Sequence, residues 1–331
     1  AEHGYNVSAI ARVLGLSRNA ARGRLVALGY RRDEEAPPEP FEVEDVLPEE
    51  LPSAAELLER RKHDFNRKNK AVEARKLVNV KIKIDGPIGI AHFGDPHVDD
   101  DGCDIGQLER HIHCIQDTEG LFGANVGDMQ NAWVGRLAHL YGQQSTSAAE
   151  AWVLVEWMVT AINWLYILKG NHDCWTGEGD PLDWMVKTQQ GVLQAWGARL
   201  NLKFPGRNDG VRINARHDFS GHSMWSPIHG AAKAIQMGWR DHVLTCGHKH
   251  VSGYAVLKCP ATGLISHALR VAGYKIHDRY AAERGLPDQN VSPTFVTIIR
   301  PEFADNDPRL IHTIFDVEEA AEYLTWLRRD L

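Results

Sequence analysis

Five short polar clusters follow apolar segments in a fixed order between residues 95 and 250, and they constrain the fold more than any other feature of this sequence. The clusters are Asp95-Pro96-His97, Gly127-Asp128, Gly170-Asn171-His172-Asp173, a histidine at 217 or 222, and Gly247-His248-Lys249-His250. Several of them come directly after a β-branched, apolar run, where a strand would end and a loop would begin. An open α/β sheet builds its binding sites from such loops at the carboxyl ends of its strands. The sequence therefore predicts an α/β fold in which distant segments converge on one site.

The side chains in these clusters are oxygen and nitrogen ligands of divalent metal ions. Carboxylates, amides and imidazoles suit hard-to-borderline cations, and no cysteine is needed. A two-metal hydrolase requires a carboxylate between the ions, terminal ligands for each ion and a histidine near the leaving group. The clusters supply all of these, so we expect two divalent metal ions, with manganese favoured and iron, zinc or nickel as alternatives.

The order of the clusters resembles that of the calcineurin-like metallophosphoesterase family, whose pattern is D-x-H, G-D, G-N-H-D/E, H and G-H-x-H. The resemblance covers roughly residues 85–275, and G-N-H-D and G-H-K-H are its most specific motifs. The segment around His217, which reads R-H-D-F-S-G-H-S from residue 216, is also similar to metallophosphoesterases carried by phages and prophages. The resemblance implies a four-layer α/β/β/α sandwich with the metal site at the edge between two sheets.

The resemblance also implies a role for each site residue. It assigns seven metal ligands: Asp95, His97, Asp128, Asn171, His217, His248 and His250. Asp95, His97 and His250 would bind the first ion, and Asn171 and His248 the second. Asp128 would bridge two cations about 3.5–4 Å apart. A neutral amide at position 171 limits the negative charge around the ions and keeps them electrophilic.

His172 is expected to act on the leaving group instead of binding a metal. Water between two divalent ions has a lowered pKa, and a nearby histidine can supply the proton that the departing alkoxide needs. Many relatives pair this histidine with a carboxylate three residues after the bridging aspartate, and here that position is Asn131. An asparagine cannot raise the pKa of a histidine as a carboxylate does. Either Asp173 or another acid assists His172, or the leaving group needs less assistance.

Two histidines compete for the single-histidine position. His217 ends the strand-like run that begins at Val211, as the family's single histidine usually ends its strand, and His222 follows five residues later. We favour His217 as the ligand, and His222 then lines the substrate pocket. Two further candidates for substrate binding follow Asp128: Asn131 and Arg136. An arginine in such a loop can clamp a phosphate through two parallel hydrogen bonds.

Other polar residues near the motifs are expected to have no direct role. Asp99, Asp100 and Asp101 are interpreted as a solvated acidic loop, with a contact to an outer-shell water or metal as the less favoured alternative. His111 and His113 are two residues apart on an expected helix, so they lie on different faces. Both are predicted to be surface residues.

Residues 5–30 are compact, basic and helical in pattern. The first helix is expected to end at Gly15, and Ser17 is expected to cap the second. Residues 1–32 therefore resemble a helix-turn-helix, with Leu25 and Leu28 facing inward. The second helix would present four polar side chains to DNA: Arg18, Asn19, Arg22 and Arg24. The competing interpretation is a helical hairpin with a solvated basic face.

The following segment changes abruptly in composition. Residues 33–59 interleave acidic residues with prolines, which predicts an extended linker that buries little apolar surface. Residues 53–76 are then interpreted as a charged, mostly basic helix that leads into a metallophosphoesterase domain at residues 60–331. Contact with phosphate and a solvated helix face are about equally favoured for this helix.

The rest of the chain alternates strand-like and helical segments. Strands are expected at residues 78–84 and 88–93 on either side of a turn, and at 295–299 and 310–315 near the end. The apolar stretch 151–168 should begin as a buried helix and end as a strand. A closing helix at 317–331 follows Asp316, its expected cap.

Composition limits the class of protein. A chain of 331 residues with 43% hydrophobic and 24% charged residues is typical of a globular protein with about two domains. The formal net charge of −7 argues against an all-over basic coat for nucleic acid. Five cysteines without a C-x-x-C pair favour a reduced cytoplasmic interior. No signal peptide and no membrane-spanning segment is expected, which predicts a soluble protein of a bacterium or a phage-infected host.

Three functional hypotheses remain. The leading one is a dinuclear-metal phosphoesterase that hydrolyses phosphodiester bonds, with DNA as substrate and an N-terminal segment that delivers the enzyme to it. The second changes the substrate to a phosphoprotein or a small phosphoester, although the G-D-x-x-D-R-G motif of protein phosphatases is not matched at Gly127. The third is a DNA-binding regulator with a vestigial metal site, against which the complete ligand set argues. The fold alone does not choose among them.

Overall fold

The computed structural model describes residues 6–30, 51–175, 181–187, 191–277, 282, 285 and 289–331. The chain forms two compact units, Ala1–His63 and Asp64–Leu331, and each is described by itself. Most of the expected acidic linker, residues 33–59, lies outside the described residues.

The first unit contains two short helices, α1 (Val7–Val13) and α2 (Arg18–Ala27). The Ser17 side chain accepts a hydrogen bond from the N–H of Ala20 at 3.2 Å, which satisfies one of the free donors at the start of α2. Gly15 lies in the turn with a φ of +60°, a conformation that glycine adopts without strain. The two helices, the turn glycine and the Ser17 cap are therefore confirmed.

The packing of these helices differs from one expectation. Ala11 and Ala21 are buried, as small residues at a helix crossing should be, but Leu28 is 72% exposed instead of facing inward. Helix α2 ends at Ala27, so Leu28 lies past its last turn, and no third helix among residues 6–30 covers it. The four side chains expected to face DNA are all exposed: Arg18, Asn19, Arg22 and Arg24.

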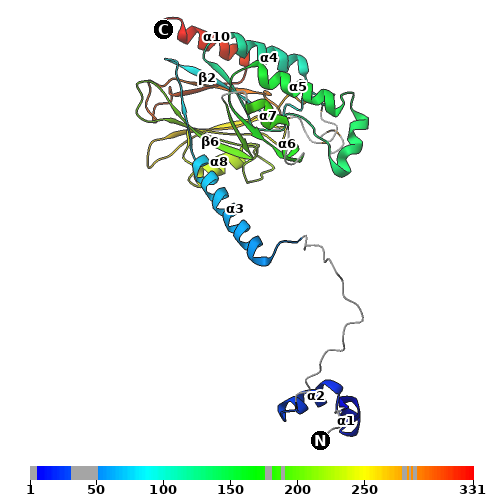
Figure 1. Ribbon diagram of the computed structural model, residues 1–331. Coiled ribbons are helices and arrows are strands. Elements are labelled where there is room, and N and C mark those ends of the chain that lie inside the picture. Colours follow the sequence, from blue (N-terminus) through cyan, green and yellow to red (C-terminus); the bar gives the residue numbers. More distant parts are fainter. Residues whose placement is uncertain are drawn as a thin grey trace. The chain divides into compact units, whose positions relative to one another are not determined.

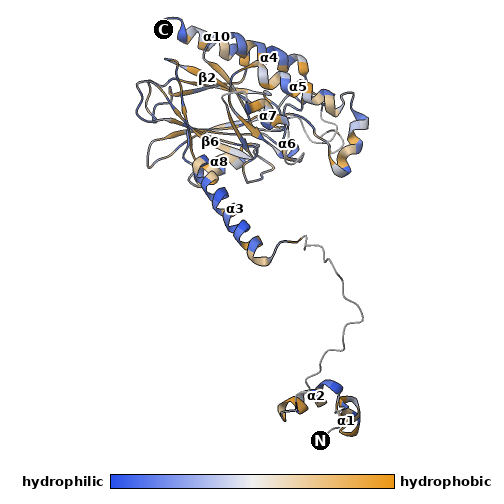
Figure 2. Ribbon diagram, in the orientation of Figure 1, coloured by the Kyte–Doolittle hydropathy of each residue, from blue (hydrophilic) through white to orange (hydrophobic). Residues whose placement is uncertain are grey.

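Helix α3 (Ala54–Arg75) confirms the predicted basic helix. Ser53 begins it, because its side chain accepts from the N–H of Glu56 at 3.3 Å while the Glu56 carboxylate accepts from the N–H of Ser53 at 2.8 Å. None of its residues is buried, and its ribbon is hydrophilic along the middle with more apolar residues toward both ends (Figure 2). Its larger apolar side chains, such as Leu58, Phe65 and Val72, are exposed, so they form no buried face.

The second unit is built on two six-stranded sheets (Figure 1). Sheet A has the order β1-β6-β7-β8-β10-β9, and sheet B the order β12-β11-β2-β3-β4-β5. The strands of sheet A are β1 (Val78–Lys81), β6 (Gly197–Lys203), β7 (Val211–Arg216), β8 (Val243–Cys246), β9 (Gly253–Lys258) and β10 (Ile265–Arg270). Those of sheet B are β2 (Ile88–Phe93), β3 (Leu121–Asn125), β4 (Trp164–Lys169), β5 (Val192–Ala195), β11 (Phe295–Ile299) and β12 (Ile311–Ile314).

Helices cover the outer faces of both sheets. The helices of this unit beyond α3 are α4 (Ile105–Asp117), η1 (Gly135–Gln143), α5 (Ala148–Ala161), α6 (Asn171–Trp175), α7 (Pro181–Lys187), α8 (His229–Gln236) and α10 (Val317–Arg328). Helices α4 and α10 contact strands of sheet B, and α8 contacts sheet A (Figure 1). The layers therefore run helix, sheet, sheet, helix, which confirms the predicted four-layer α/β architecture.

Strand β2 shows how the sequence produces these layers. All six of its residues are buried, and successive side chains of a strand point to opposite faces. Ile88 and Ile90 pack in the core between the sheets, whereas Ala91 and Phe93 pack in the core under the helices of sheet B. A continuous apolar run is what a strand covered on both faces requires.

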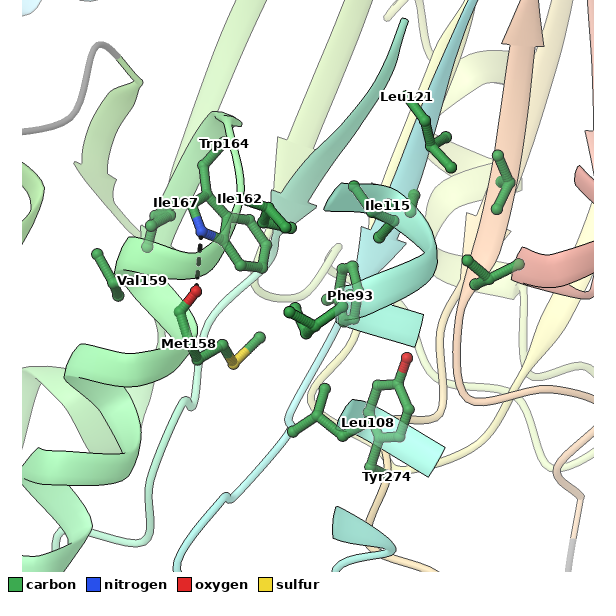
Figure 3. Close-up of a cluster of buried hydrophobic side chains, with 14 of the residues drawn as sticks. Phe93, Leu108, Ile115, Leu121, Met158, Val159, Ile162, Trp164, Ile167 and Tyr274 are labelled. Carbon is green, nitrogen blue, oxygen red and sulfur yellow. Dashed lines mark hydrogen bonds between the residues drawn. The ribbon is translucent and has the colours of Figure 1, made fainter. Parts of the chain in front are cut away.

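The apolar stretch 151–168 divides as expected into α5 and β4. Trp164 turns back onto the end of α5, where its indole N–H donates to the main-chain oxygen of Met158 at 3.3 Å (Figure 3). Its ring meets the edge of Phe93 at a centroid distance of 5.4 Å. These contacts fix the helix against the sheet whose strand ends carry the polar clusters.

Several other boundaries are confirmed with small changes. Strands β11 and β12 correspond to the two expected at the end of the chain, and Asp316 caps α10 through the N–H of Glu319 at 2.8 Å. The first expected strand is shorter than predicted and ends at Lys81. No helix in the described part of the chain is both long enough and apolar enough to span a membrane.

Candidate metal centre

Three neighbouring parallel strands of sheet B, β2, β3 and β4, end at the same edge. The loop after β2 carries Asp95 and His97, the loop after β3 carries Asp128, and Asn171 follows β4. The N–H of Asp95 donates to the main-chain oxygen of Gly127 at 3.1 Å, and that of His97 to the oxygen of Asp128 at 3.2 Å. These bonds continue the β2–β3 pairing beyond the sheet and hold two ligand-bearing loops side by side.

Sheet A supplies the remaining side chains. His217 follows β7, and His248 and His250 follow the neighbouring parallel strand β8. The imidazole of His217 extends toward sheet B, with Nε2 3.2 Å from an Asp128 carboxylate oxygen and 2.8 Å from the Asn171 amide. Its Nε2 is also 3.0 Å from Nδ1 of His248. The predicted ligands of the two sheets therefore meet in the space between the strand ends.

The side chains form three overlapping groups, and within each group the ligand atoms lie within 4.8 Å of one another. One group is Asp95, His97 and His250, the second is His97, Asp128 and His172, and the third is Asp128, His217 and His248. Asp128 belongs to two of them, as a carboxylate between two ions would. Together with the Asn171 amide, all seven positions predicted as ligands lie in this centre.

Backbone strain is concentrated on the same residues. Seven non-glycine residues in the described part of the chain have a positive φ, and five are predicted ligands: Asp95 (+45°), His97 (+42°), Asp128 (+55°), His248 (+71°) and His250 (+49°). Each such residue costs on the order of 1–2 kcal/mol. Strain of this kind persists where the surrounding structure requires a particular side-chain direction, so these loops are shaped to aim their side chains.

Buried polar atoms in the centre are left without protein partners. Among the described residues, Asp95 Oδ1 and both ring nitrogens of His97 make no hydrogen bond. A buried polar group without a partner costs about 1–3 kcal/mol. Burial raises the pKa of Asp95 to about 8 and lowers that of His97 well below its usual value. A divalent cation would satisfy these atoms and reverse the cost of burying the carboxylate, so the donor set fits a metal site.

Asp128 and His217 form the charged core of the centre. Burial opposes ionisation of Asp128, yet the hydrogen bond and charge of His217 bring its pKa below the usual value. Burial likewise opposes protonation of His217, but the hydrogen bond to Asp128 and the charge of Asp95 raise its pKa to about 9. Asp128 and His217 therefore favour each other's ionised forms.

Gly127 allows the two sheets to approach this closely. Its φ is +118°, and a Cβ at this position would lie 2.6 Å from the nitrogen of Gly170 and 2.8 Å from Nδ1 of His217. Neither the conformation nor the space admits a side chain. The glycine before the bridging aspartate is thus required by the contact between the loops.

His172 is oriented by the main chain of Asn131. Its Nδ1 donates to the Asn131 carbonyl oxygen at 2.5 Å, and its own N–H donates to Asp128 Oδ1 at 2.9 Å. Nε2 lies 4.0 Å from the other Asp128 oxygen and faces the centre. Burial lowers the pKa of His172, and the charge of Asp128 opposes this shift. The indole of Trp175 lies against the imidazole at a centroid distance of 4.2 Å.

Asp173 has a different contact from the one expected. Its buried carboxylate accepts hydrogen bonds from the N–H groups of Asp128 at 2.7 Å, Gly170 at 2.9 Å and Met129 at 3.2 Å. These bonds tie the loop after β3 to the loop after β4. Asp173 therefore holds the backbone around the bridging position, and Asn131 provides the partner of His172.

The acidic loop is only partly solvated, contrary to expectation. Asp99 is buried, and its carboxylate accepts from the N–H of Asn131 at 2.7 Å and from the side chain of Gln144 at 3.3 Å. The Asn131 side chain donates to Asp100 and Gln144, both at 3.0 Å. These residues support Asn131, whose carbonyl orients His172.

The structure does not bring every predicted site residue to the centre. Arg136, on η1, and His222 are exposed, and neither belongs to any of the three ligand groups. The geometry therefore favours His217 over His222 at the single-histidine position.

His113 is exposed as expected, but His111 is buried. Its Nδ1 lies 2.7 Å from the Tyr274 hydroxyl, so the prediction of His111 as a surface residue is wrong. The helix face that it shares with Leu108 packs on the sheet.

Arg270 is a residue of the centre that the motifs do not indicate. It is fully buried at the end of β10 and donates to main-chain oxygens of Gly247 and Pro227 and, at 2.7 Å, to the Asp218 carboxylate. It thus joins the two loops that carry His217 and His248. Its position in the sequence, far from any motif, gave no signal of this contact.

No protein-family model matches this sequence, and neither does any curated protein. Among solved structures, the chain is similar to vacuolar protein sorting 29 from Cryptosporidium parvum, with 11% identity and a TM-score of 0.36 over 70% of this chain and 98% of that one. It is also similar to the calcineurin-like phosphoesterase YfkN from Bacillus subtilis, with 11% identity and a TM-score of 0.37 over 74% and 96%. A third is the NAD nucleotidase of Haemophilus influenzae, with 12% identity and a TM-score of 0.35 over 69% of this chain and 49% of that one. These similarities are too distant to assign a family, so function is inferred from the site.

Proposed function

We propose that this protein is a dinuclear-metal phosphoesterase that hydrolyses phosphodiester bonds, with DNA as its substrate. The observation that carries the proposal is the set of three overlapping ligand groups, two of which contain Asp128 and one of which contains His172. Two divalent ions bound here would polarise a phosphoryl oxygen and activate a water molecule. Manganese is the favoured ion, because oxygen and imidazole ligands suit it and no thiolate is present.

The protein's own residues would position the ions and handle the proton. Asp95, His97 and His250 would hold one ion, and Asn171, His217 and His248 the other, with Asp128 between them. Because Nδ1 of His172 is fixed by the Asn131 carbonyl, Nε2 is left to deliver a proton to the leaving oxygen. Burial of Asp95, His97, Asp128 and His217 strengthens their electrostatic contacts.

Two features support DNA as the substrate. The exposed side chains of α2, Arg18, Asn19, Arg22 and Arg24, offer cations and an amide of the kind that contact phosphates and bases. Helix α3 adds a solvated basic surface. We propose that the N-terminal unit delivers the enzyme to nucleic acid in the cytoplasm. A phosphatase acting on phosphoproteins or small phosphoesters is the second candidate. Its only support is that one fold and one kind of site can serve several substrates.

The test compares four substrates in the presence of Mn²⁺: bis-p-nitrophenyl phosphate, p-nitrophenyl phosphate, and labelled single- and double-stranded DNA. We expect diester and DNA hydrolysis, abolished by Asp128→Asn, with DNA hydrolysis alone weakened by a triple substitution of Arg18, Arg22 and Arg24 with alanine. Activity restricted to the monoester would support the phosphatase. Inactivity with every divalent metal would support a DNA-binding regulator with a vestigial site.

A further inference from the structure

A basic pocket of about 320 Å³ lies beside sheet A, away from the ligand groups. It is lined by the last turn of α3, the adjoining ends of β6 and β7, and Trp239. The charged side chains that line it are all cationic: Arg75, Lys76, Arg199 and Arg216. No acidic residue lines it in the described part of the chain, so the pocket suits an anion.

The cations of the pocket are not neutralised equally. Arg199 forms two hydrogen bonds of 2.7 Å with the buried carboxylate of Asp241, and this fixes the wall of the pocket. Arg75 and Arg216 form no ion pair with a described carboxylate, and Lys76 has only Glu73 at 3.8 Å on the exposed helix surface. The guanidinium groups of Arg199 and Arg216 each lie 5.3 Å from the ring centroid of Trp239. At least two positive charges therefore remain available.

The pocket and the metal centre both lie where β7 ends and its neighbour β6 begins. On β7, Ile213 and Ala215 face the core between the sheets, so Arg216 points to the outer face and His217, the next residue, to the inner one. Gly197 pairs with Arg216 and lines the pocket. Arg216 and His217 therefore place the pocket and the metal centre on opposite faces of the same strand end.

Trp196 lies between the two sites. Its carbonyl oxygen accepts from the N–H of His217 at 3.0 Å, and its indole is 6.4 Å from the His217 ring. The side chain is 52% exposed, and its φ of +65° is one of two positive values that described non-glycine residues other than the predicted ligands adopt. An exposed indole held by a strained backbone is poorly explained by packing, and it fits a stacking surface.

We propose that this pocket and Trp196 form a binding track for single-stranded nucleic acid, in which the pocket holds a backbone phosphate and Trp196 stacks on a base. This rests on the proposed function, because the scissile phosphate of the same strand would lie at the metal centre. Sequence-tolerant binding of single strands uses two components. One is a set of cations along the sugar-phosphate backbone, and the other is an aromatic side chain that stacks on a base. A pocket of this volume accepts one nucleotide and excludes a duplex.

The experiment measures fluorescence anisotropy of a labelled 12-nucleotide phosphorothioate single strand with the full-length, Mn²⁺-loaded protein. All proteins carry Arg18→Ala, Arg22→Ala and Arg24→Ala, so that the N-terminal unit contributes little, and gels verify that the probe stays intact. The test variants are Arg75→Glu/Lys76→Glu and, separately, Trp196→Ala. The matched control is Arg110→Glu/Arg329→Glu, which reverses two exposed charges on α4 and after α10, over the opposite sheet.

We expect the pocket double variant to bind about tenfold or more weakly and to show a smaller salt dependence, since each lost phosphate contact lowers the slope by about 0.7. Trp196→Ala should weaken binding about fivefold or more, and the control should stay within about twofold. Equal affinities of the pocket variant and the control would overturn the proposal. Equal loss of affinity for a 12-base-pair duplex would overturn the single-strand assignment.

Hydrolysis of bis-p-nitrophenyl phosphate by the same preparations separates this inference from the proposed function. The small diester reports on the metal centre without needing the track. Diester hydrolysis with unchanged oligonucleotide affinity would reject the track alone. Weakened oligonucleotide binding in a protein that hydrolyses no phosphoester would support the track and reject the phosphoesterase.

Discussion

Nδ1 of His172 donates a 2.5 Å hydrogen bond to the main-chain carbonyl oxygen of Asn131, so the histidine is oriented by backbone where a carboxylate side chain was expected. The side chain of Asn131 points elsewhere and donates to Asp100 and Gln144. The N–H of Asn131 donates to the carboxylate of the buried Asp99 and so holds the residue from its other side. A proton donor can thus be positioned without a carboxylate beside it: burial lowers its pKa, and the charge of Asp128 and the hydrogen bond to Asn131 oppose that shift.

Asn131→Asp should reduce activity instead of improving it. The new carboxylate would lie 3.0 Å from Asp100, where Asn131 now donates a hydrogen bond, and the like charges would repel each other and shift the loop that orients His172. We expect kcat on a phosphodiester to fall by about tenfold and the melting temperature to fall. Asn131→Ser, which adds no charge, is the control and should lose less. A variant faster than the wild type would show that His172 lacks a carboxylate partner that it needs.

Mn²⁺ should stabilise the protein, and EDTA should destabilise it. Asp95 and His97 bury polar atoms that have no hydrogen-bond partner among the described residues, and a bound cation would satisfy them. Binding only to the folded state contributes about 2.7 kcal/mol at a hundredfold excess over Kd. Differential scanning calorimetry should show a melting temperature that rises with Mn²⁺ in the wild type and hardly changes in Asp95→Ala. A shift of equal size in both proteins would place the binding site elsewhere.

Asp173→Asn should destabilise the loops around Asp128. Its carboxylate accepts three backbone hydrogen bonds, and an amide brings an N–H₂ group against at least one of those donors. The expected cost is about 2–4 kcal/mol in urea unfolding, because charged hydrogen bonds are lost in a buried place. Asp183→Asn, a partly exposed aspartate, is the control and should cost less than about 1 kcal/mol. Unchanged Mn²⁺ affinity in Asp173→Asn would contradict its role in holding the metal loops.

Stability should fall as the pH is lowered toward 5, partly through His92. This buried histidine lies 2.9 Å from the Thr297 hydroxyl, and burial lowers its pKa to about 3. In the unfolded chain it titrates near 6.5, so its contribution is complete above that value and is lost progressively between about 6.5 and 3. Between pH 7.5 and 5, the contribution of His92 to the free energy of unfolding should fall by about 2 kcal/mol. His92→Gln should flatten the pH dependence, whereas the exposed control His113→Gln should retain it; identical slopes would contradict the assignment.

The ligand positions could be predicted from sequence because their clusters match the motif order of the family that the chain resembles, and because several of them follow apolar, strand-like runs. Parallel strands that end at one edge must bring Asp95, Asp128 and Asn171 together, whatever the rest of the chain does. The supporting residues carry no such signal. Arg270 and Asp173 act on backbone atoms of loops that are distant in sequence, so their partners become visible only in three dimensions.

Two wrong expectations show where local pattern fails. The two-residue spacing of His111 and His113 predicts surface positions for both, but the helix face of His111 packs on the sheet and the Tyr274 hydroxyl contacts its ring. Leu28 was assigned to the inside by helical spacing, although α2 ends one residue earlier. In both cases burial depended on which element covers the residue, and that is a property of the tertiary structure.

The most direct test of the metal centre is an anomalous difference map from a crystal of the protein grown with Mn²⁺. We expect two peaks about 3.5–4 Å apart, one beside Asp95, His97 and His250 and the other beside Asn171, His217 and His248, with Asp128 between them. A map with no peak among these residues, or with a single ion that Asp128 does not touch, would contradict it.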